Sequence, residues 1–244
     1  MEKIAIIIPS RLSAERLPNK PLKLINNKEM ILHVYDIAKS ANVGEVIVAT
    51  PDKEILNLVK THNGQAVLTS DKHQTGTDRA FEVFERKLRS KPDVIINFQG
   101  DMPNLNPEAI KDLVTHMKKN LCDIATLASD IENEQEGKDP NVVKVLTNNE
   151  IKNKNFSKAL DFFRTSNKPL NKMIYHHVGI YAFTNKALIR YVSLKRTKLE
   201  VERKLEQMRA LENQMKIDVG YINTCPLSVD TEADLKAVRK IMEN

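Results

Sequence analysis

The residues best suited to chemistry in this chain are charged side chains that follow apolar segments. Arg11, Arg16 and Lys20 lie within ten residues of one another, directly after the apolar run at residues 4–8. The loop is stiffened by two prolines, and its fork-shaped arginine donors and lysine point charge can surround a triphosphate. It lacks a glycine-rich phosphate loop ending in Lys-Ser/Thr, which argues against an ordinary P-loop kinase or ATPase. Charge alone also allows a solvated basic loop.

Two aspartates occupy positions suited to a metal ion. Asp101 follows the apolar run at residues 94–98 and the flexible Gly100. A carboxylate there can hold Mg²⁺ bound to substrate phosphates. Asp230 precedes Thr231 and Asp234, whose pattern predicts a capping box that fixes its position. Either aspartate alone would also suit a turn or a helix cap.

The elements that must position these residues follow a strand–helix alternation. Apolar runs predict strands at residues 4–9, 46–50, 66–69, 94–98 and 124–129, with helical patterns between them. Strands that are apolar on both faces indicate a parallel sheet. The pattern therefore predicts an α/β fold with a mainly parallel, doubly wound (Rossmann-like) sheet, whose ligands bind at the carboxyl ends of the strands.

The pattern changes after about residue 130. Strands are predicted at residues 142–146, 175–183 and 217–221, and a charged helix at residues 199–215. Leu199, Leu205, Met208 and Leu211 form a narrow apolar stripe on that helix, as expected when a helix packs on a partner. We expect one domain over residues 1–244, with residues 150–215 forming an inserted interaction arm.

Composition narrows the functional classes. Hydrophobic residues make up 41% and charged residues 29%, which is typical of a globular protein. No apolar run approaches the roughly 20 residues of a membrane helix, so we expect a cytoplasmic protein. The net charge of +6 suits nucleotides, whereas 5% aromatic residues give nucleic-acid binding little support. Cys122 and Cys225 are far apart and are expected to be reduced thiols.

The basic loop resembles the N-terminal signature I-I-P-A-R-x-x-S-x-R-L-P-G-K-P-L of sugar nucleotidyltransferases, and within them of the cytidylyltransferases that activate 3-deoxy-manno-octulosonate (Kdo). The residues in register are Arg11, Ser13, Arg16, Pro18, Lys20 and Pro21. Sialic-acid cytidylyltransferases carry Lys-Gly where this chain has Glu15-Arg16. Asn19 replaces a glycine, and asparagine also tolerates a left-handed conformation. The resemblance implies that Arg11, Ser13, Arg16 and Lys20 bind nucleotide, with Arg11 and Lys20 catalytic.

Residues 71–79 resemble the family's D-H-x-S-G-T-E/D-R element, which is expected to contact cytosine and ribose. The nucleotide-binding residues implied here are Thr75, Gly76, Thr77 and Arg79. Gly76 permits close approach of the backbone to a flat base, and the helix opened by Arg79 has its N-terminus facing the ligand. The same residues would suit an ordinary helix start capped by Thr77.

The segment F-Q-G-D-M-P at residues 98–103 resembles the family's x-Q-G-D-E-P, with Met102 in place of glutamate. Residues 227–234 resemble its G-V-D-T-P-E-D-L. The resemblance implies that Asp101 and Asp230 hold Mg²⁺ and that both are catalytic, with Asp101 also contacting the nucleotide. A metal on these carboxylates would neutralise phosphate charge and lower the pKa of an attacking hydroxyl.

The sugar side is implied by two further segments. Residues 175–183 resemble the family's H-x-G-I-Y-x-Y/F strand, and residues 199–211 its S-P-L-E…L-E-Q-L-R helix. The sugar-binding residues implied by the family are Gln99, Lys158, His177, Tyr181, Glu206 and Gln207. Lys158 stands where the family has an arginine and gives a weaker, non-bidentate contact with a carboxylate. Arg164 lies six residues further on and could substitute for it.

The resemblance thus implies transfer of CMP from CTP to the anomeric hydroxyl of Kdo, giving CMP-Kdo and pyrophosphate for lipopolysaccharide biosynthesis. The expected partners are CTP and an acidic eight-carbon sugar, the expected cofactor is Mg²⁺, and neither nucleic acid nor membrane is expected. The expected assembly is a homodimer with Leu205 and Met208 near the shared surface. Alternatives are a cytidylyltransferase for an amino-octulosonate or nonulosonate, and a catalytically silent nucleotide-binding homologue.

Overall fold

The chain forms two compact units in the computed structural model, which describes residues 3–13, 16–88, 91–119, 121–153, 155–165 and 171–243. Met1–Lys111 and Pro226–Asn244 make up the first unit, and Asp112–Cys225 the second. The polypeptide therefore leaves the first unit, builds the second and returns. Where the sequence indicates one domain, the structure shows these two units, and the predicted arm at residues 150–215 lies entirely within the second.

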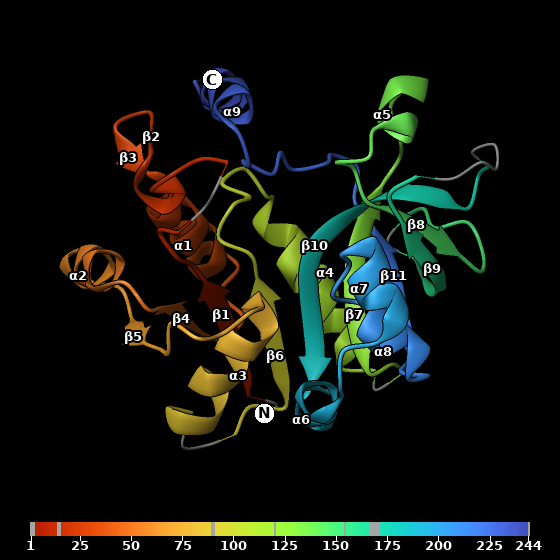
Figure 1. The fold of residues 1–244 in the computed structure, drawn as a ribbon, viewed down its shortest axis with the longest axis horizontal. Coiled ribbons are helices and arrows are strands. Elements are labelled where there is room, and N and C mark those ends of the chain that lie inside the picture. The colour runs from red at the N-terminus through yellow and green to blue at the C-terminus, as the bar shows by residue number, and fades with distance from the viewer. Residues whose placement is uncertain are drawn as a thin grey trace. The chain divides into compact units, whose positions relative to one another are not determined.

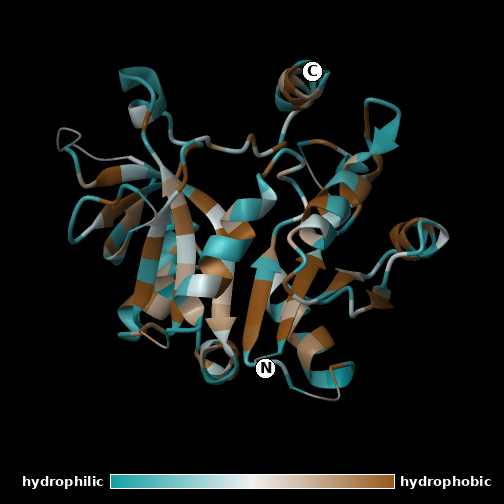
Figure 2. Cartoon of the chain, turned by 180° about the vertical axis from the view of Figure 1, so that it is seen from behind, coloured by the Kyte–Doolittle hydropathy of each residue, from teal (hydrophilic) through white to brown (hydrophobic). Residues whose placement is uncertain are grey.

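Four parallel strands form the sheet of the first unit (Figure 1). They are β1 (Ile4–Pro9), β4 (Glu45–Thr50), β5 (Ala66–Leu68) and β6 (Val94–Phe98). Their order is β5-β4-β1-β6, and every pairing is parallel. All six residues of β1 are buried without alternation, as expected of a strand covered on both faces. The predicted parallel arrangement is confirmed for this unit, and its strands are predominantly brown in Figure 2.

Helices follow the strands of the first unit, together with a short hairpin. The helices are η1 (Lys20–Leu22), α1 (Met30–Ser40), α2 (Lys53–Thr61), α3 (Gly76–Arg86) and α9 (Glu232–Met242). The hairpin consists of β2 (Leu24–Ile25) and β3 (Lys28–Glu29), and α4 (Pro107–Met117) runs from the first unit into the second. Among the described residues, no helix combines the length and apolar character needed to cross a membrane.

One apolar cluster ties the start of the chain to its end. Its buried members are Leu17, Ile25, Met30, Val229, Leu235 and Val238. Leu17 belongs to the basic loop, and Val229 directly precedes Asp230. Burial of such side chains stabilises by roughly 1.5–3 kcal/mol each. The cluster therefore holds the basic loop and the C-terminal segment against each other.

The second unit contains a mixed set of strands. They are β7 (Ile124–Ser129), β8 (Lys144–Thr147), β9 (Phe156–Phe163), β10 (Ile174–Thr184) and β11 (Ile217–Tyr221). The order is β10-β7-β11-β9-β8, and β8 also pairs with β10, so the pairings close a circuit. Among the strand pairings of the described residues of this unit, that of β7 with β11 is parallel and the others are antiparallel. The predicted mainly parallel sheet therefore holds for the first unit alone, and the doubly wound arrangement stays a prediction.

Short helices complete the second unit. They are α5 (Glu134–Lys138), α6 (Asn185–Ser193), α7 (Lys198–Arg203) and α8 (Met208–Glu212). The single helix predicted at residues 199–215 is therefore wrong, because Lys204 adopts a left-handed conformation with φ 53° and ends α7. Leu205 and Met208 are 4% and 1% exposed. Both are therefore buried and do not lie on the surface, where the predicted dimer contact would need them.

Candidate active site

A pocket of about 570 Å³ in the first unit collects most of the predicted nucleotide and metal residues. The predicted residues that line it are Arg11, Ser13, Arg16, Lys20, Thr75, Gly76, Arg79, Gln99, Asp101 and Asp230. They come from the loop after β1, the start of α3, the loop after β6 and the segment before α9. Three of these segments follow parallel strands, and this edge of such a sheet is where ligands bind.

Two carboxylates converge on one ammonium inside this pocket. Lys20 Nζ lies 3.1 Å from Asp101 Oδ2 and 3.0 Å from Asp230 Oδ1. Arg16 Nη2 lies 2.8 Å from Asp230 Oδ2. Burial alone would lower the pKa of Lys20, but the two carboxylates outweigh it and raise that pKa above its ordinary value. Burial alone would raise the pKa of Asp230, but Lys20 and Arg16 outweigh it and hold that pKa below its ordinary value.

The local backbone explains how these groups are brought together. Asn19 caps η1 with φ 56°, which confirms that asparagine supplies the left-handed conformation at the family's glycine position. The N–H of Val229 donates to the carbonyl oxygen of Asp101 over 2.9 Å, so the two segments that carry the aspartates are joined directly. Met102 is 4% exposed, so the position of the family's glutamate is part of the core here.

The start of α3 forms another wall of the pocket. Thr75 caps the helix and accepts a hydrogen bond from the Asp78 N–H at 3.1 Å, so the cap is Thr75 and not Thr77. A Cβ added at Gly76 would lie 3.0 Å from Gln99 Nε2 and 3.2 Å from Pro9 Cγ. Any larger residue would therefore press on the pocket wall, and the predicted approach of this glycine to a flat base stays a prediction.

Thr77 and Arg79 are buried next to this wall. Thr77 Oγ1 accepts from Asn97 Nδ2 at 3.0 Å and does not line the pocket. Arg79 Nη1 donates to Thr69 Oγ1 at 2.6 Å and to the Ser70 carbonyl oxygen at 2.8 Å. Burial, together with the charge of Arg11, lowers the pKa of Arg79. Arg79 thus holds the preceding loop as well as lining the pocket.

Sequence reasoning assigned no role to two residues that shape the pocket. His73 lines it, and His73 Nε2 lies 2.5 Å from Glu82 Oε2 on α3, which also accepts from the Ser70 N–H at 2.9 Å. Asp52 Oδ2 accepts from the Leu12 N–H at 2.8 Å and so positions the basic loop. The position of His73 within residues 71–79, which resemble a nucleotide-binding element, could have indicated a role for it at the pocket. No sequence feature indicated a role for Asp52.

The predicted sugar residues are divided between the units. Gln99 lines the pocket of the first unit, and its Nε2 lies 3.2 Å from Asn97 Oδ1. The others lie in the second unit. There His177 and Tyr181 are neighbours on β10, with ring centroids 5.5 Å apart. The negative charge of Glu206 adds to burial in raising the pKa of Tyr181 above its ordinary range. The structure therefore brings these three together.

His177 is held as a neutral ring. Its Nε2 lies 3.0 Å from Thr126 Oγ1, which donates to the Ile180 carbonyl oxygen at 2.8 Å. Because the threonine hydroxyl has one hydrogen, it accepts from Nε2–H of His177, which leaves Nδ1 as an acceptor. Burial, together with the charge of His176, lowers the pKa of His177 to about 3.

Glu206 and Gln207 lie at the break between α7 and α8. The Glu206 carbonyl oxygen accepts from the Tyr191 hydroxyl at 2.8 Å, and Gln207 is buried. The two helices are joined by a buried ion pair, in which Arg209 Nε and Nη2 lie 2.9 and 2.6 Å from the two oxygens of Glu200. This bidentate contact fixes the segment that carries Glu206 and Gln207.

Lys158 is not brought together with the other sugar residues. In the register of β10, β7, β11 and β9, one row of residues that are directly opposite each other across the strands consists of Tyr181, Thr126, Val219 and Ser157. The adjacent row contains Ala182, Ala125, Asp218 and Lys158. Successive residues of a strand point to opposite faces, so Lys158 lies on the face opposite Tyr181. Arg164, the proposed substitute, donates to the carbonyl oxygens of Pro140 and Asn141.

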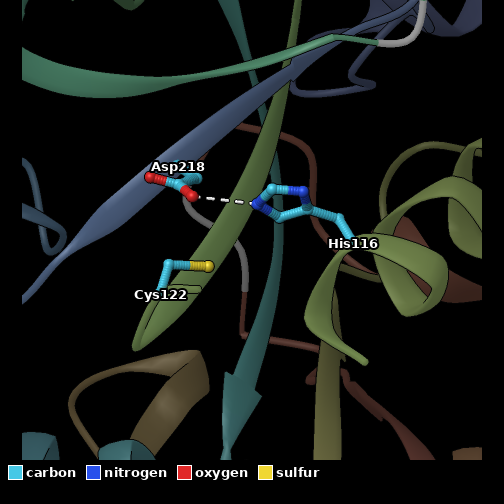
Figure 3. A group of neighbouring side chains, drawn as sticks. All are labelled: His116, Cys122 and Asp218. Carbon is cyan, nitrogen blue, oxygen red and sulfur yellow. Dashed lines mark hydrogen bonds and ion pairs between the residues drawn. The ribbon is translucent and has the colours of Figure 1, made fainter. Parts of the chain in front are cut away.

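A separate buried cluster in the second unit has side chains of metal-ligand type (Figure 3). His116, Cys122 and Asp218 place their ligand atoms within 4.8 Å of one another. His116 Nε2 already bonds Asp218 Oδ2 at 2.9 Å, and its ring stacks on Phe156 with centroids 3.8 Å apart. Burial raises the pKa of Cys122 to about 12, so the thiol stays protonated. Through these contacts His116 links α4 to β11 and β9.

Similarity to known proteins agrees with this geometry. A family model described as cytidylyltransferase matches residues 5–217. The 3-deoxy-manno-octulosonate cytidylyltransferase of Bartonella tribocorum is 42% identical over 238 residues, covering 97% of each chain, and that of Bartonella bacilliformis is 42% identical over 241 residues, covering 98% of each. A solved CMP:2-keto-3-deoxy-manno-octonic acid synthetase in complex with CTP has a TM-score of 0.89 and 36% identity, covering 99% of this chain and 98% of that one. The chain therefore belongs to the 3-deoxy-manno-octulosonate cytidylyltransferase family.

Proposed function

We propose that this chain is the enzyme that transfers CMP from CTP to the anomeric hydroxyl of 3-deoxy-manno-octulosonate, with release of pyrophosphate. The observation that carries the proposal is the convergence of Lys20, Asp101 and Asp230, with Arg16, in one pocket. Family membership supports it, as does the similarity to a synthetase whose structure contains CTP.

Within the pocket, the cations would bind the triphosphate. Arg11 and Ser13 line the pocket on the loop after β1, and Arg16 and Lys20 follow on the same loop. As the sugar hydroxyl attacks the α-phosphorus in line and pyrophosphate leaves, negative charge accumulates on the phosphate oxygens. Fixed cations stabilise that charge more in the transition state than in the ground state.

Asp101 and Asp230 fit a bound Mg²⁺. Each has a carboxylate oxygen within about 3 Å of the same nitrogen of Lys20, so both carboxylates can bind a single cation at that position. Their donors are hard oxygens, as Mg²⁺ prefers. Among the described residues that line the pocket, none has a sulfur ligand, and the one imidazole, that of His73, is bonded to Glu82. When bound, the ion would supply charge neutralisation on the phosphates and a lower pKa for the attacking hydroxyl.

His177, Tyr181, Glu206 and Gln207 in the second unit offer the sugar a mixture of donors and acceptors. Such a set suits a ligand rich in hydroxyl groups. A hydroxyl-binding site of this kind discriminates strongly against analogues that leave its buried polar groups unpaired. An amino-octulosonate or a nonulosonate is not favoured, since both relatives named above are Kdo enzymes. A silent nucleotide-binding homologue would have no need for both carboxylates.

The remaining parts of the proposal concern context. We place the enzyme in the cytoplasm, where CTP is available, in lipopolysaccharide biosynthesis, which the Kdo substrate implies. We also propose a homodimer formed through the second unit, where Leu160 on β9 and Val201 on α7 are 45% and 54% exposed. Light scattering at tens of micromolar (a typical concentration for such assays) should give twice the chain mass, and a monomer would contradict the dimer.

Pyrophosphate release tests the proposed reaction. The assay would combine CTP or UTP with Kdo, an amino-octulosonate or a nonulosonate. CTP with Kdo should be the best pair, because an acceptor placed for the cytosine amino group would face a repelling carbonyl in uracil, costing about 1–3 kcal/mol per buried group. This corresponds to a roughly 5- to 150-fold preference for each contact. Equal use of UTP and CTP would replace the cytidyl assignment with a broader nucleotidyltransferase.

A further inference from the structure

The pair of aspartates proposed to hold a divalent cation already has a cation between them. Lys20 Nζ is within hydrogen-bonding distance of Asp101 Oδ2 at 3.1 Å and Asp230 Oδ1 at 3.0 Å. Arg16 takes the remaining oxygen of Asp230 at 2.8 Å. The Lys20 side chain is 15% exposed, whereas Arg16 is 58% exposed. The buried lysine is therefore the principal counter-charge of the two carboxylates.

The backbone around Lys20 is held by hydrogen bonds within the basic loop. The Lys20 N–H donates to the Leu17 carbonyl oxygen at 3.2 Å, and the Asn19 N–H to the Leu12 carbonyl oxygen at 3.2 Å. Leu17 is buried in the apolar cluster that also contains Val229. Lysine carries its charge on a long flexible stem, so the ammonium can move between anionic partners without displacing the loop.

We infer that Lys20 occupies the cation position in the nucleotide-free protein, so that the divalent cation and the nucleotide bind as a coupled pair. This inference rests on the proposed function, because it takes Asp101 and Asp230 as the metal ligands. A divalent cation arriving alone has to expel the ammonium and leave it in the pocket beside a second positive charge. A triphosphate gives Lys20 and Arg16 new anionic partners and frees the carboxylates for the metal.

Two consequences follow from this exchange of partners. The free protein binds divalent cations weakly, because the bound ammonium competes for the same oxygens. Nucleotide raises the affinity for the cation, and by thermodynamic linkage the cation raises the affinity for nucleotide by the same factor. Lys20 thus acts as a positioning residue for the metal as well as a ligand for phosphate.

The test measures Mn²⁺ binding to the full chain without nucleotide, by electron paramagnetic resonance and titration calorimetry. Wild-type protein should bind weakly, and Lys20→Met should bind at least about tenfold more tightly, within the usual range of coupling between ligands. Lys20→Gln serves as a second variant that keeps a polar side chain. The matched control is Lys23→Met, which removes the same charge three residues away at a position that does not line the pocket. It should bind Mn²⁺ like the wild type.

Thermal unfolding adds a readout that does not depend on turnover. Mn²⁺ should raise the melting temperature of Lys20→Met more than that of the wild type, because the ion replaces the missing counter-charge. Adding Asp101→Asn to Lys20→Met should remove the gain in affinity. Unchanged or weaker Mn²⁺ binding by both Lys20 variants would overturn the inference.

Failure of the inference can be told apart from failure of the proposed metal site. Wild-type protein with CTP should bind Mn²⁺, and Asp101→Asn should not. Suppose that this result is obtained but the Lys20 variants bind Mn²⁺ no more tightly than the wild type without nucleotide. The metal site is then supported, and the inference that Lys20 occupies the cation position is wrong. If Mn²⁺ binding with CTP is unaffected by Asp101→Asn, both the metal assignment and the inference fall.

Discussion

The backbone N–H of Val229 donates to the carbonyl oxygen of Asp101 over 2.9 Å, which joins the two separate chain segments of the first unit. This bond sets the spacing between Asp101 and Asp230 by a main-chain contact. The capping box of Thr231 and Asp234 fixes the other side of Asp230, with the Asp230 N–H 3.0 Å from Asp234 Oδ2. The position of the two carboxylates is therefore determined by backbone and capping contacts.

Replacement of either carboxylate should remove most activity. Asp101→Asn and Asp230→Asn should each lower kcat by at least about 10²-fold, a typical loss for a contact that stabilises transition-state charge. Chelation should abolish turnover of the wild type, and Mg²⁺ or Mn²⁺ should restore it. Steady-state kinetics with thermal unfolding as a folding control would measure this. Near-wild-type kcat in either variant would remove that residue from the metal site.

Asp52 should affect nucleotide binding without touching the nucleotide, because its carboxylate holds the Leu12 N–H in the basic loop. Asp52→Ala should raise KM for CTP roughly five- to tenfold, which corresponds to about 1 kcal/mol from a lost hydrogen bond. Asp52→Asn keeps an acceptor oxygen and should recover much of the affinity. Equal KM in Asp52→Ala and wild type would show that the loop is held by its other contacts.

The buried pair of Arg209 and Glu200 should contribute far more to stability than the exposed pair on the same helix. Arg209→Met leaves the Glu200 carboxylate buried without its bidentate partner and should cost about 3–5 kcal/mol. The matched control is Lys198→Met, whose partner is Glu202 at 3.7 Å with both side chains exposed, and it should cost less than about 1 kcal/mol. Chemical denaturation would compare the two, and similar losses would contradict the assignment.

His177 should make stability depend on pH in the acid range. Its pKa is about 3 in the folded chain, below the ordinary value of 6.5. Below pH 6.5 the unfolded chain therefore binds a proton that the folded chain does not. The contribution of the neutral ring to the free energy of unfolding should be complete above about pH 6.5. It should fall by roughly 1 to 1.5 kcal/mol per pH unit as the pH drops toward 3. His177→Gln should flatten that part of the profile measured by denaturation, and an unchanged slope would show that the folded ring accepts a proton.

Much of the first unit could be predicted because its signals are local. The uninterrupted apolar run of β1, the capping box at Thr231 and the asparagine at position 19 each specify a backbone conformation by themselves. The prediction that the aspartates and the basic loop lie together rested on the rule that ligands bind at the carboxyl ends of parallel strands. The motif resemblance supplied the order of these segments along the chain.

The second unit was harder to predict because its signals come from packing. The apolar stripe at Leu205 and Met208 has helical spacing, but the left-handed Lys204 breaks the helix and turns both residues into the core. β9 was missed because Ser157, Lys158 and Asp161 interrupt its apolar residues and leave no apolar run. The face on which Lys158 lies depends on a register that only strand pairing reveals. Asp52 was missed since its bond is to a backbone N–H distant in sequence.

The discontinuous first unit has a consequence for biosynthesis. Lys20 and Asp101 leave the ribosome early, but Asp230 and three members of the apolar cluster around Leu17 (Val229, Leu235 and Val238) are translated after the whole second unit. A nascent chain that has completed the second unit still has an open apolar surface around Leu17 and an unfinished pocket. The pocket can therefore bind the reactants only after one late step, in which the C-terminal segment packs onto the part of the first unit that was translated first.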